Sequence, residues 1–123
     1  MKLKENLYTV VSKDMVEGGQ SFVITLNSSC SIYAAHFPGM PITPGVCMIQ
    51  LVEELLEELI GCSLRVCAIK NAKFLSVLKP EGQNVIVTFS GVKVENEIIS
   101  SQAIISDFNS DVYARISLQT IIA

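Results

Sequence analysis

HFPGMPITPG, at residues 36–45, is the stretch that decides the fold, together with the helical pattern that follows it. It holds the single histidine of the chain, His36, and three of the four prolines. Each residue before a proline is driven toward extended geometry, so this stretch is not expected to be helical. Pro44 suits the first position of a helix, where its missing N–H costs nothing, and Thr43 is the predicted N-cap. We therefore expect a stiff arm with an imidazole, joined directly to a helix N-terminus.

The helix is predicted at residues 44–60 and ends at Gly61, a suitable C-cap. Its first turn, residues 46–49, is apolar on every side, so this end is expected to be buried. Farther along, the polar side chains fall on one stripe, which predicts a single solvated face near the C-terminal end. That stripe comprises Gln50, Glu53, Glu54, Glu57 and Glu58.

Strand patterns occupy most of the remaining chain, at residues 21–26, 64–72, 74–78, 84–94, 98–107 and 112–122. Residues 7–11 fit either a short strand or a first helical turn. A long apolar helix followed by hairpin-linked strands indicates an α+β fold, in which an antiparallel sheet wraps one long central helix. Nothing divides the chain, so residues 1–123 are expected to form a single domain.

Composition narrows the classes of function. Residues 18–52 contain no Asp, Glu, Lys or Arg, which predicts deep burial or an interface between subunits. Prolines, glycines and polar side chains interrupt this stretch, so it is not expected to span a membrane. A net charge of −3 and the absence of tryptophan give no indication of nucleic-acid binding. Four scattered cysteines with one histidine make a poor metal site, and they predict reduced core residues in a cytoplasmic protein.

The arm and the helix together suggest a reaction centre. The first N–H groups of a helix lack intrahelical partners and favour negative charge, so the N–H of Gly45 or Val46 can bind a carbonyl oxygen that gains charge. His36 beside such a site is suited to remove a proton next to that carbonyl. The alternative, that His36 is a turn or packing residue, is the commoner case for a lone histidine.

Residues 36–46 resemble the signature of the hotdog-fold β-hydroxyacyl-(acyl carrier protein) dehydratases, and residues 73–82 are similar to a later Phe…Pro-Gly segment of that family, one residue longer here. Tyr33 stands where the family usually has an aromatic residue. The resemblance implies a hotdog fold, a role in fatty acid biosynthesis, and a homodimer with two sites at its interface. It implies that His36 is catalytic, that Phe37, Gly45 and Val46 contact the substrate, and that neither metal nor cofactor is needed. The partner would be an acyl carrier protein or a coenzyme A thioester.

One departure from the family pattern concerns the catalytic carboxylate. The family has a carboxylate on the partner's helix where this chain has Gln50, and commonly a glutamine where this chain has Glu54. Ala35 replaces the usual glycine before the histidine. An amide cannot deliver a proton to a departing hydroxyl at neutral pH. We therefore expect one of two roles for Glu54. It partly substitutes for the missing catalytic carboxylate, or it only hydrogen-bonds to Gln50 or lies in solvent.

Two other functions remain open at this point, because a fold does not determine a function. The first is a hotdog thioesterase, in which Gln50 helps to position water. The second is a non-catalytic hotdog subunit that binds acyl chains or pairs with a catalytic partner. Four basic residues are concentrated at positions 65–79, where they would steer an acidic carrier protein or serve as ordinary exposed charges. They are Arg65, Lys70, Lys73 and Lys79.

Overall fold

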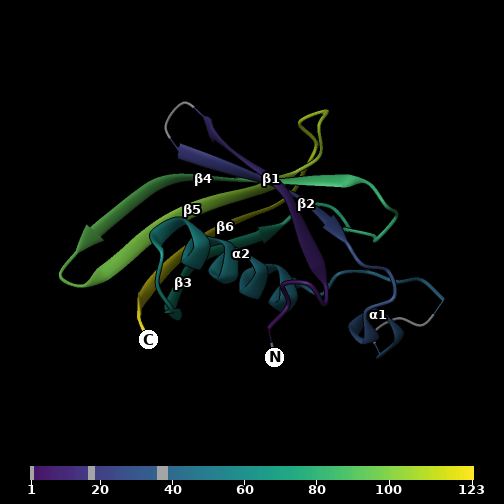
Figure 1. The fold of residues 1–123 in the computed structure, drawn as a ribbon, viewed down its shortest axis with the longest axis horizontal. Helices are drawn as coiled ribbons and strands as arrows, with labels where there is room; N and C mark the ends of the chain where they lie inside the picture. The colour runs from purple at the N-terminus through teal and green to yellow at the C-terminus, as the bar shows by residue number, and fades with distance from the viewer. Residues whose placement is uncertain (1, 17–18, 36–38) are drawn as a thin grey trace.

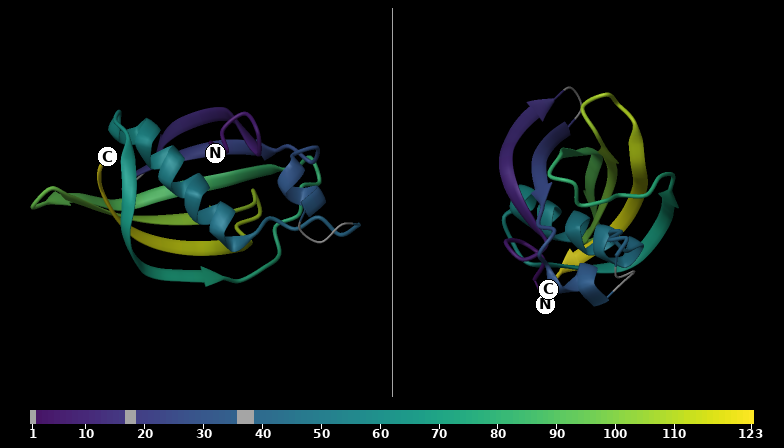
Figure 2. Two further views of the ribbon diagram at one scale, coloured as in Figure 1. Left: turned by 90° about the horizontal axis from the view of Figure 1, so that it is seen from below. Right: turned by 90° about the vertical axis from the view of Figure 1, so that its right-hand side faces the viewer.

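The structure, a computed structural model, describes residues 2–16, 19–35 and 39–123. In these ranges six strands form one antiparallel sheet in the order β1-β2-β4-β5-β6-β3. The strands are β1 (Tyr8–Val16), β2 (Gly19–Leu26), β3 (Leu64–Phe74), β4 (Asn84–Glu95), β5 (Ile98–Ser106) and β6 (Val112–Ile122). A short helix, α1 (Ser31–Ala35), precedes the long helix α2 (Gly45–Ile60). The sheet curves around α2, which confirms the predicted α+β arrangement (Figures 1 and 2).

The core lies between α2 and the concave face of the sheet. Val52, Leu55 and Leu56 of α2 are fully buried. On the sheet side, the rings of Phe22 and Phe89 meet edge to face, with their centroids 5.9 Å apart. Each large apolar side chain buried in this way contributes about 1.5–3 kcal/mol to folding. The helix is therefore held by its apolar stripe, as the spacing of these residues in the sequence predicts.

The bounds of α2 agree with the sequence except at the first residue. Gly61 ends the helix in the left-handed conformation, with φ of 91°, and its N–H donates to the carbonyl of Glu57. The prediction that Thr43 is the N-cap is wrong, because Pro44 holds that position in extended geometry. The Thr43 hydroxyl is instead bonded to the hydroxyl of Tyr33, at 2.8 Å.

Two strand predictions need correction. Residues 74–78 are not a separate strand, because β3 continues to Phe74 and its pairing with β6 stops there. The N–H groups of Leu75 and Ser76 both donate to the carbonyl of Tyr113 as the chain leaves the sheet. Residues 8–11 of the ambiguous segment are part of β1, which pairs with β2, and Leu7 lies in the turn before it. Helix α1 was not predicted.

The prediction that the polar stripe of α2 is solvated is also wrong. Glu54 is only 7% exposed. Glu53 and Glu57 accept hydrogen bonds from the backbone N–H groups of Val66 and Leu64, at 2.9 and 2.7 Å. β3 is an edge strand, so N–H groups on its outer side have no neighbouring strand to bond to. These carboxylates accept hydrogen bonds from two of them. The stripe therefore joins the helix to neighbouring backbone.

The two predictions about burial have mixed outcomes. In the isolated chain Met48 is buried, but Val46 at the start of α2 is 72% exposed, so the expected burial of the whole first turn is wrong for one chain. The four cysteines are free, but only Cys30 is fully buried, and Cys67 is exposed.

Within the described ranges, no helix combines the length and apolarity needed to cross a bilayer.

Candidate functional site

His36 and Phe37, the catalytic and substrate-contacting residues predicted for the arm, lie outside the described residues. Gly45, Val46, Gln50 and Glu54 are all described, and all four belong to α2. They span the first three turns of the helix. Their surroundings decide what this part of the chain can do chemically.

Two hydrogen bonds, one at Tyr33 and one at Thr43, hold the chain before and after residues 36–38. Tyr33, in the middle of α1, is 3% exposed, and its hydroxyl is bonded to that of Thr43. The N–H of Thr43 donates to the carbonyl of Leu78, at 2.8 Å. Burial raises the pKa of Tyr33 more than the bond to Thr43 lowers it, so the phenol stays neutral. The sequence signal for the bond at Tyr33 was the aromatic residue at position 33.

The N-terminus of α2 opens beside the ring of Phe74. A Cβ atom added to Gly45 would lie 2.9 Å from this ring, closer than ordinary packing allows. Glycine at position 45 therefore lets the aromatic ring approach the first N–H groups of the helix. No side chain of the described residues caps this end through a hydrogen bond. N–H groups of this kind can donate hydrogen bonds to an anion or to a carbonyl oxygen with developing charge.

An apolar groove adjoins this helix end, with a volume of about 440 Å³. Phe74, Leu75 and Val77 are each about half exposed along it, which is unusual for large apolar side chains outside an interface or a ligand site. The groove is lined by Ile42, Thr43, Gly45, Met48, Phe74, Leu75, Ser76, Val77 and Leu78. It could hold an apolar chain whose polar end reaches the helix N-terminus.

Gln50 is bonded to Glu54. Its side-chain Nε2 donates to Oε2 of Glu54, at 3.0 Å, across one turn of α2. The sequence left open whether Glu54 hydrogen-bonds to Gln50 or lies in solvent, and the structure shows the hydrogen bond. Gln50 is half-buried, and Glu54 is buried.

Three further donors meet the carboxylate of Glu54, and all three come from the N-terminal segment. The backbone N–H of Leu3 donates to Oε2 and that of Lys4 to Oε1, both at 2.8 Å. The hydroxyl of Tyr8 donates to Oε1, at 3.1 Å. With Gln50 included, each oxygen accepts two hydrogen bonds. Burial, followed by the charge of Glu54, raises the pKa of Tyr8, so this phenol remains a donor.

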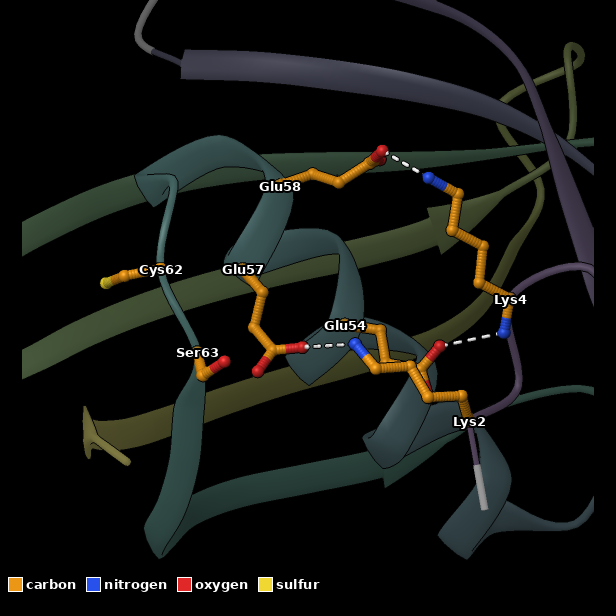
Figure 3. Close-up of a pocket in the computed structure, with 7 residues that line it drawn as sticks. All are labelled: Lys2, Lys4, Glu54, Glu57, Glu58, Cys62 and Ser63. Carbon is orange, nitrogen blue, oxygen red and sulfur yellow. Dashed lines mark hydrogen bonds and ion pairs between the residues drawn. The ribbon is translucent and has the colours of Figure 1, made fainter.

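The same segment is held to the C-terminal half of α2 by ion pairs (Figure 3). Lys4 Nζ lies 2.6 Å from Glu58, and Lys2 Nζ lies 3.6 Å from Glu57. The bond to Glu58 raises the pKa of Lys4. A depression of about 290 Å³ lies among these groups, lined by Lys2, Lys4, Glu54, Glu57, Glu58, Cys62 and Ser63. Most of the charged groups that line the depression bind the N-terminal segment. We therefore interpret the depression as having a structural role and not as a ligand site.

Other candidates in the described part of the chain are less suited to chemistry. Burial raises the pKa of the Cys47 thiol, which argues against a nucleophile there. No group of three His, Cys, Asp or Glu side chains within residues 2–16, 19–35 and 39–123 is arranged to hold a metal ion. The four basic residues of positions 65–79 are all exposed on or just after β3.

Comparison with known proteins shows the family of this chain. Residues 13–106 match the family model described as ApeI-like, ApeI dehydratase. The chain belongs to the ApeI-like dehydratase family. A 3-hydroxyacyl-[acyl-carrier-protein] dehydratase FabZ of Lactiplantibacillus plantarum is 31% identical to this family member over 121 residues, which covers 87% of this chain and 82% of that protein.

Solved structures identify the fold of this ApeI-like protein as the hotdog fold. The dehydratase heterocomplex ApeI:P from Xenorhabdus doucetiae matches with a TM-score of 0.72 at 15% identity, covering 92% of this chain and 96% of that one. Thioesterase HI1161 from Haemophilus influenzae matches with a TM-score of 0.60 at 16% identity, covering 96% of this chain and 81% of that one. At these identities the structural likeness shows the fold alone.

Sequence reasoning missed several residues around this site. Leu3, Lys4 and Tyr8 lie more than 40 positions from Glu54, and no local pattern links them to it. The sequence does contain a signal for part of the groove, because Phe74 belongs to the segment at residues 73–82 that resembles the dehydratases. Its half-exposed neighbours Leu75 and Val77 were assigned to a strand, which hid their position in the groove.

Proposed function

We propose that this protein is a 3-hydroxyacyl-thioester dehydratase that acts on substrates carried by an acyl carrier protein or coenzyme A. The observation that carries the proposal is the open helix end at Gly45 beside an apolar groove, in a chain of the ApeI-like dehydratase family. The FabZ relative is named for this reaction on acyl-carrier-protein substrates. In the proposal the groove holds the acyl group or its carrier arm.

The proposed reaction is the loss of water from carbons 2 and 3 of the acyl group. His36 removes the proton from carbon 2, while the N–H of Gly45, with Val46 and Phe37 in contact with the substrate, stabilises negative charge on the thioester oxygen. The bond between carbon 3 and its hydroxyl then breaks, and a carbon–carbon double bond forms. Because Gln50 carries no acidic proton, the imidazolium formed at His36 supplies the proton that completes the departing water.

Gln50 takes the position of the family's helix carboxylate in this proposal, and Glu54 takes part through its bond to Gln50. Losing a general acid typically slows such a reaction by about 10²- to 10⁴-fold. We therefore expect slow turnover. A homodimer belongs to the same proposal, supported by the exposed Val46 and by the half-exposed apolar side chains along the groove. A cytoplasmic location, predicted from the cysteines, belongs to it as well.

The alternative of a non-catalytic partner subunit has one observation in its favour. The ApeI:P dehydratase matched by this fold is a heterocomplex. A chain with Gln50 in place of the carboxylate could depend on a second hotdog subunit to complete the active site. The thioesterase alternative has only the shared fold as support.

One incubation distinguishes these functions. The purified protein is supplied with a 3-hydroxyacyl thioester and with the matching saturated acyl thioester, and both enoyl product and free thiol are followed. We expect enoyl product from the hydroxyacyl substrate, no thiol release, and no product with His36→Ala. Thiol release without enoyl product would indicate a thioesterase. Binding without either product would indicate a partner subunit.

A further inference from the structure

A polar depression of about 400 Å³ lies across β3, β4, β5 and β6, on the face of the sheet turned away from α2 (Figure 2). Gln102 of β5 and Ser117 of β6 line it, and each is next to a buried residue, Ala103 or Ile116. Because side chains alternate between the two faces of a strand, Gln102 and Ser117 project away from the core. The depression shares no lining residue with the groove beside Gly45, so it is a separate feature of the molecule.

Pairing between the strands brings polar side chains into two neighbouring rows within this depression. Gln102 of β5 pairs with Ser117 of β6, which pairs with Asn71 of β3. The next row begins at Lys93 of β4 and ends, across β5, at Gln119 of β6. Paired residues project on the same side of a sheet, with their side chains close enough to interact. The amides and hydroxyls of both rows can therefore contact one ligand.

Irregular pairing borders the depression on two sides. The register of β3 against β6 shifts between Ile69 and Asn71, so that Lys70 is an extra residue in β3. The register of β4 against β5 shifts between Ser90 and Lys93. Bulges of this kind redirect side chains and are frequent beside binding sites. Here they put one lysine on each side, and β4 and β3 are three strand spacings apart, about 14 Å, which leaves room for a small molecule.

The amides of the depression have hydrogen-bonding capacity to spare. Within residues 2–16, 19–35 and 39–123, the side chains of Asn71, Gln102 and Gln119 make no hydrogen bond to the rest of the chain. In the same ranges Lys70 forms no ion pair, whereas Lys93 lies 3.3 Å from a carboxylate of its own strand. The depression therefore offers a positive charge without an internal partner, beside several groups that both donate and accept hydrogen bonds.

We propose that this depression binds a small phosphorylated sugar, with the phosphate at Lys70 and the sugar hydroxyls at the amides. The negative oxygens of a phosphate complement the ammonium group of Lys70. Sugar hydroxyls donate and accept hydrogen bonds, as do the amides of Gln102 and Gln119. A bare anion would leave these amides unused, and an uncharged sugar would leave Lys70 unmatched. The site does not depend on the proposed dehydration.

The test is an NMR titration of the isotopically labelled full chain with ribose 5-phosphate, ribose and inorganic phosphate. Ribose 5-phosphate should shift the backbone amide signals of residues 70–71, 91–93, 102 and 117–119. It should bind about tenfold more tightly than either of the other two probes, because each of them lacks one half of the contacts. Adenosine 5′-monophosphate carries the same phosphorylated ribose with a base attached. Tighter binding of this fourth probe at the same residues identifies the ligand as a nucleotide, and weaker binding identifies it as a free sugar phosphate.

Three variants separate a built site from general attraction of anions. Lys70→Gln should weaken the binding of ribose 5-phosphate about tenfold, because it removes the charge that faces the phosphate. Lys13→Gln is the matched control, since it removes the same charge from an exposed position of β1 at the other edge of the sheet, and it should leave the affinity unchanged. Gln102→Leu should reduce the preference for ribose 5-phosphate over inorganic phosphate. All three positions are exposed, so the fold should survive each change.

The inference is overturned if ribose 5-phosphate leaves the signals of the depression unshifted, or if wild type binds inorganic phosphate or ribose just as tightly. Equal losses of affinity in Lys70→Gln and Lys13→Gln would also overturn it, because binding would then follow net charge and not the site. An undiminished preference in Gln102→Leu would remove the sugar from the proposal.

Discussion

Replacing Glu54 by leucine is expected to destabilise the fold by about 3–5 kcal/mol, the usual cost of removing one partner from a buried charged network. The variant leaves four donors behind. Two of them, the N–H of Leu3 and the hydroxyl of Tyr8, belong to residues that are 1% exposed. The N–H of Lys4 and the amide of Gln50 are only partly buried, so water can replace part of what they lose.

A double-mutant cycle with Tyr8→Phe isolates one of these bonds. The single Tyr8→Phe change removes a hydrogen bond to a charged acceptor and should cost about 1.5–3 kcal/mol. In the Glu54→Leu background the tyrosine hydroxyl has already lost this partner, so the same change should cost almost nothing. The expected coupling between Glu54 and Tyr8 is therefore about 1.5–3 kcal/mol.

Urea unfolding followed by circular dichroism measures each free energy, since the chain has no tryptophan to report by fluorescence. The protein concentration is kept constant, because a dimer would make stability depend on it. In a thermal melt, Glu54→Leu should lower Tm by roughly 12–20 °C for a chain of this size. Glu57→Leu combined with Tyr8→Phe is the matched control and should be additive.

Additive effects of Glu54→Leu and Tyr8→Phe, within the scatter of about 0.5 kcal/mol found for independent sites, would contradict this coupling. A Glu54→Leu variant as stable as wild type would contradict the predicted loss of stability. Either result would mean that the N-terminal segment does not depend on the carboxylate.

Three other predictions concern the site, the pH dependence and the assembly. Gln50→Glu should raise the rate of dehydration roughly ten- to a thousandfold in an enoyl assay, because Glu54 disfavours a second charge and helps the new carboxyl group to keep a transferable proton; an unchanged rate in a folded variant would contradict this. Because the folded state raises the pKa of Tyr8, its contribution to stability is present below about pH 10 and is lost as the pH rises further. The free energy of unfolding should therefore fall less steeply between pH 8 and 11 in Tyr8→Phe than in wild type, as measured by urea unfolding at each pH. Sedimentation at micromolar concentration should give a dimer that buries part of residues 18–52, and a monomer that persists in the presence of a second hotdog chain would refute it.

Local chemistry was sufficient to predict the long helix. Pro44 and Gly61 mark its ends through backbone restrictions that act whatever the rest of the chain does. The spacing of Val52, Leu55 and Leu56 indicates the buried face for the same reason, since helical geometry puts them on one side. The motif of residues 36–46 likewise indicated the dehydratase family.

Tertiary structure decided what the polar groups of that helix do. Glu54 was expected in a solvated stripe, or as an acid, because sequence alone shows its helix neighbours but not Leu3, Lys4 and Tyr8, which bind it from more than 40 positions away. Thr43 was expected to cap α2, but the hydroxyl of Tyr33 binds it instead. A carboxylate or a hydroxyl binds whichever donors the folded chain brings within about 3 Å, and that choice is made by contacts between distant segments.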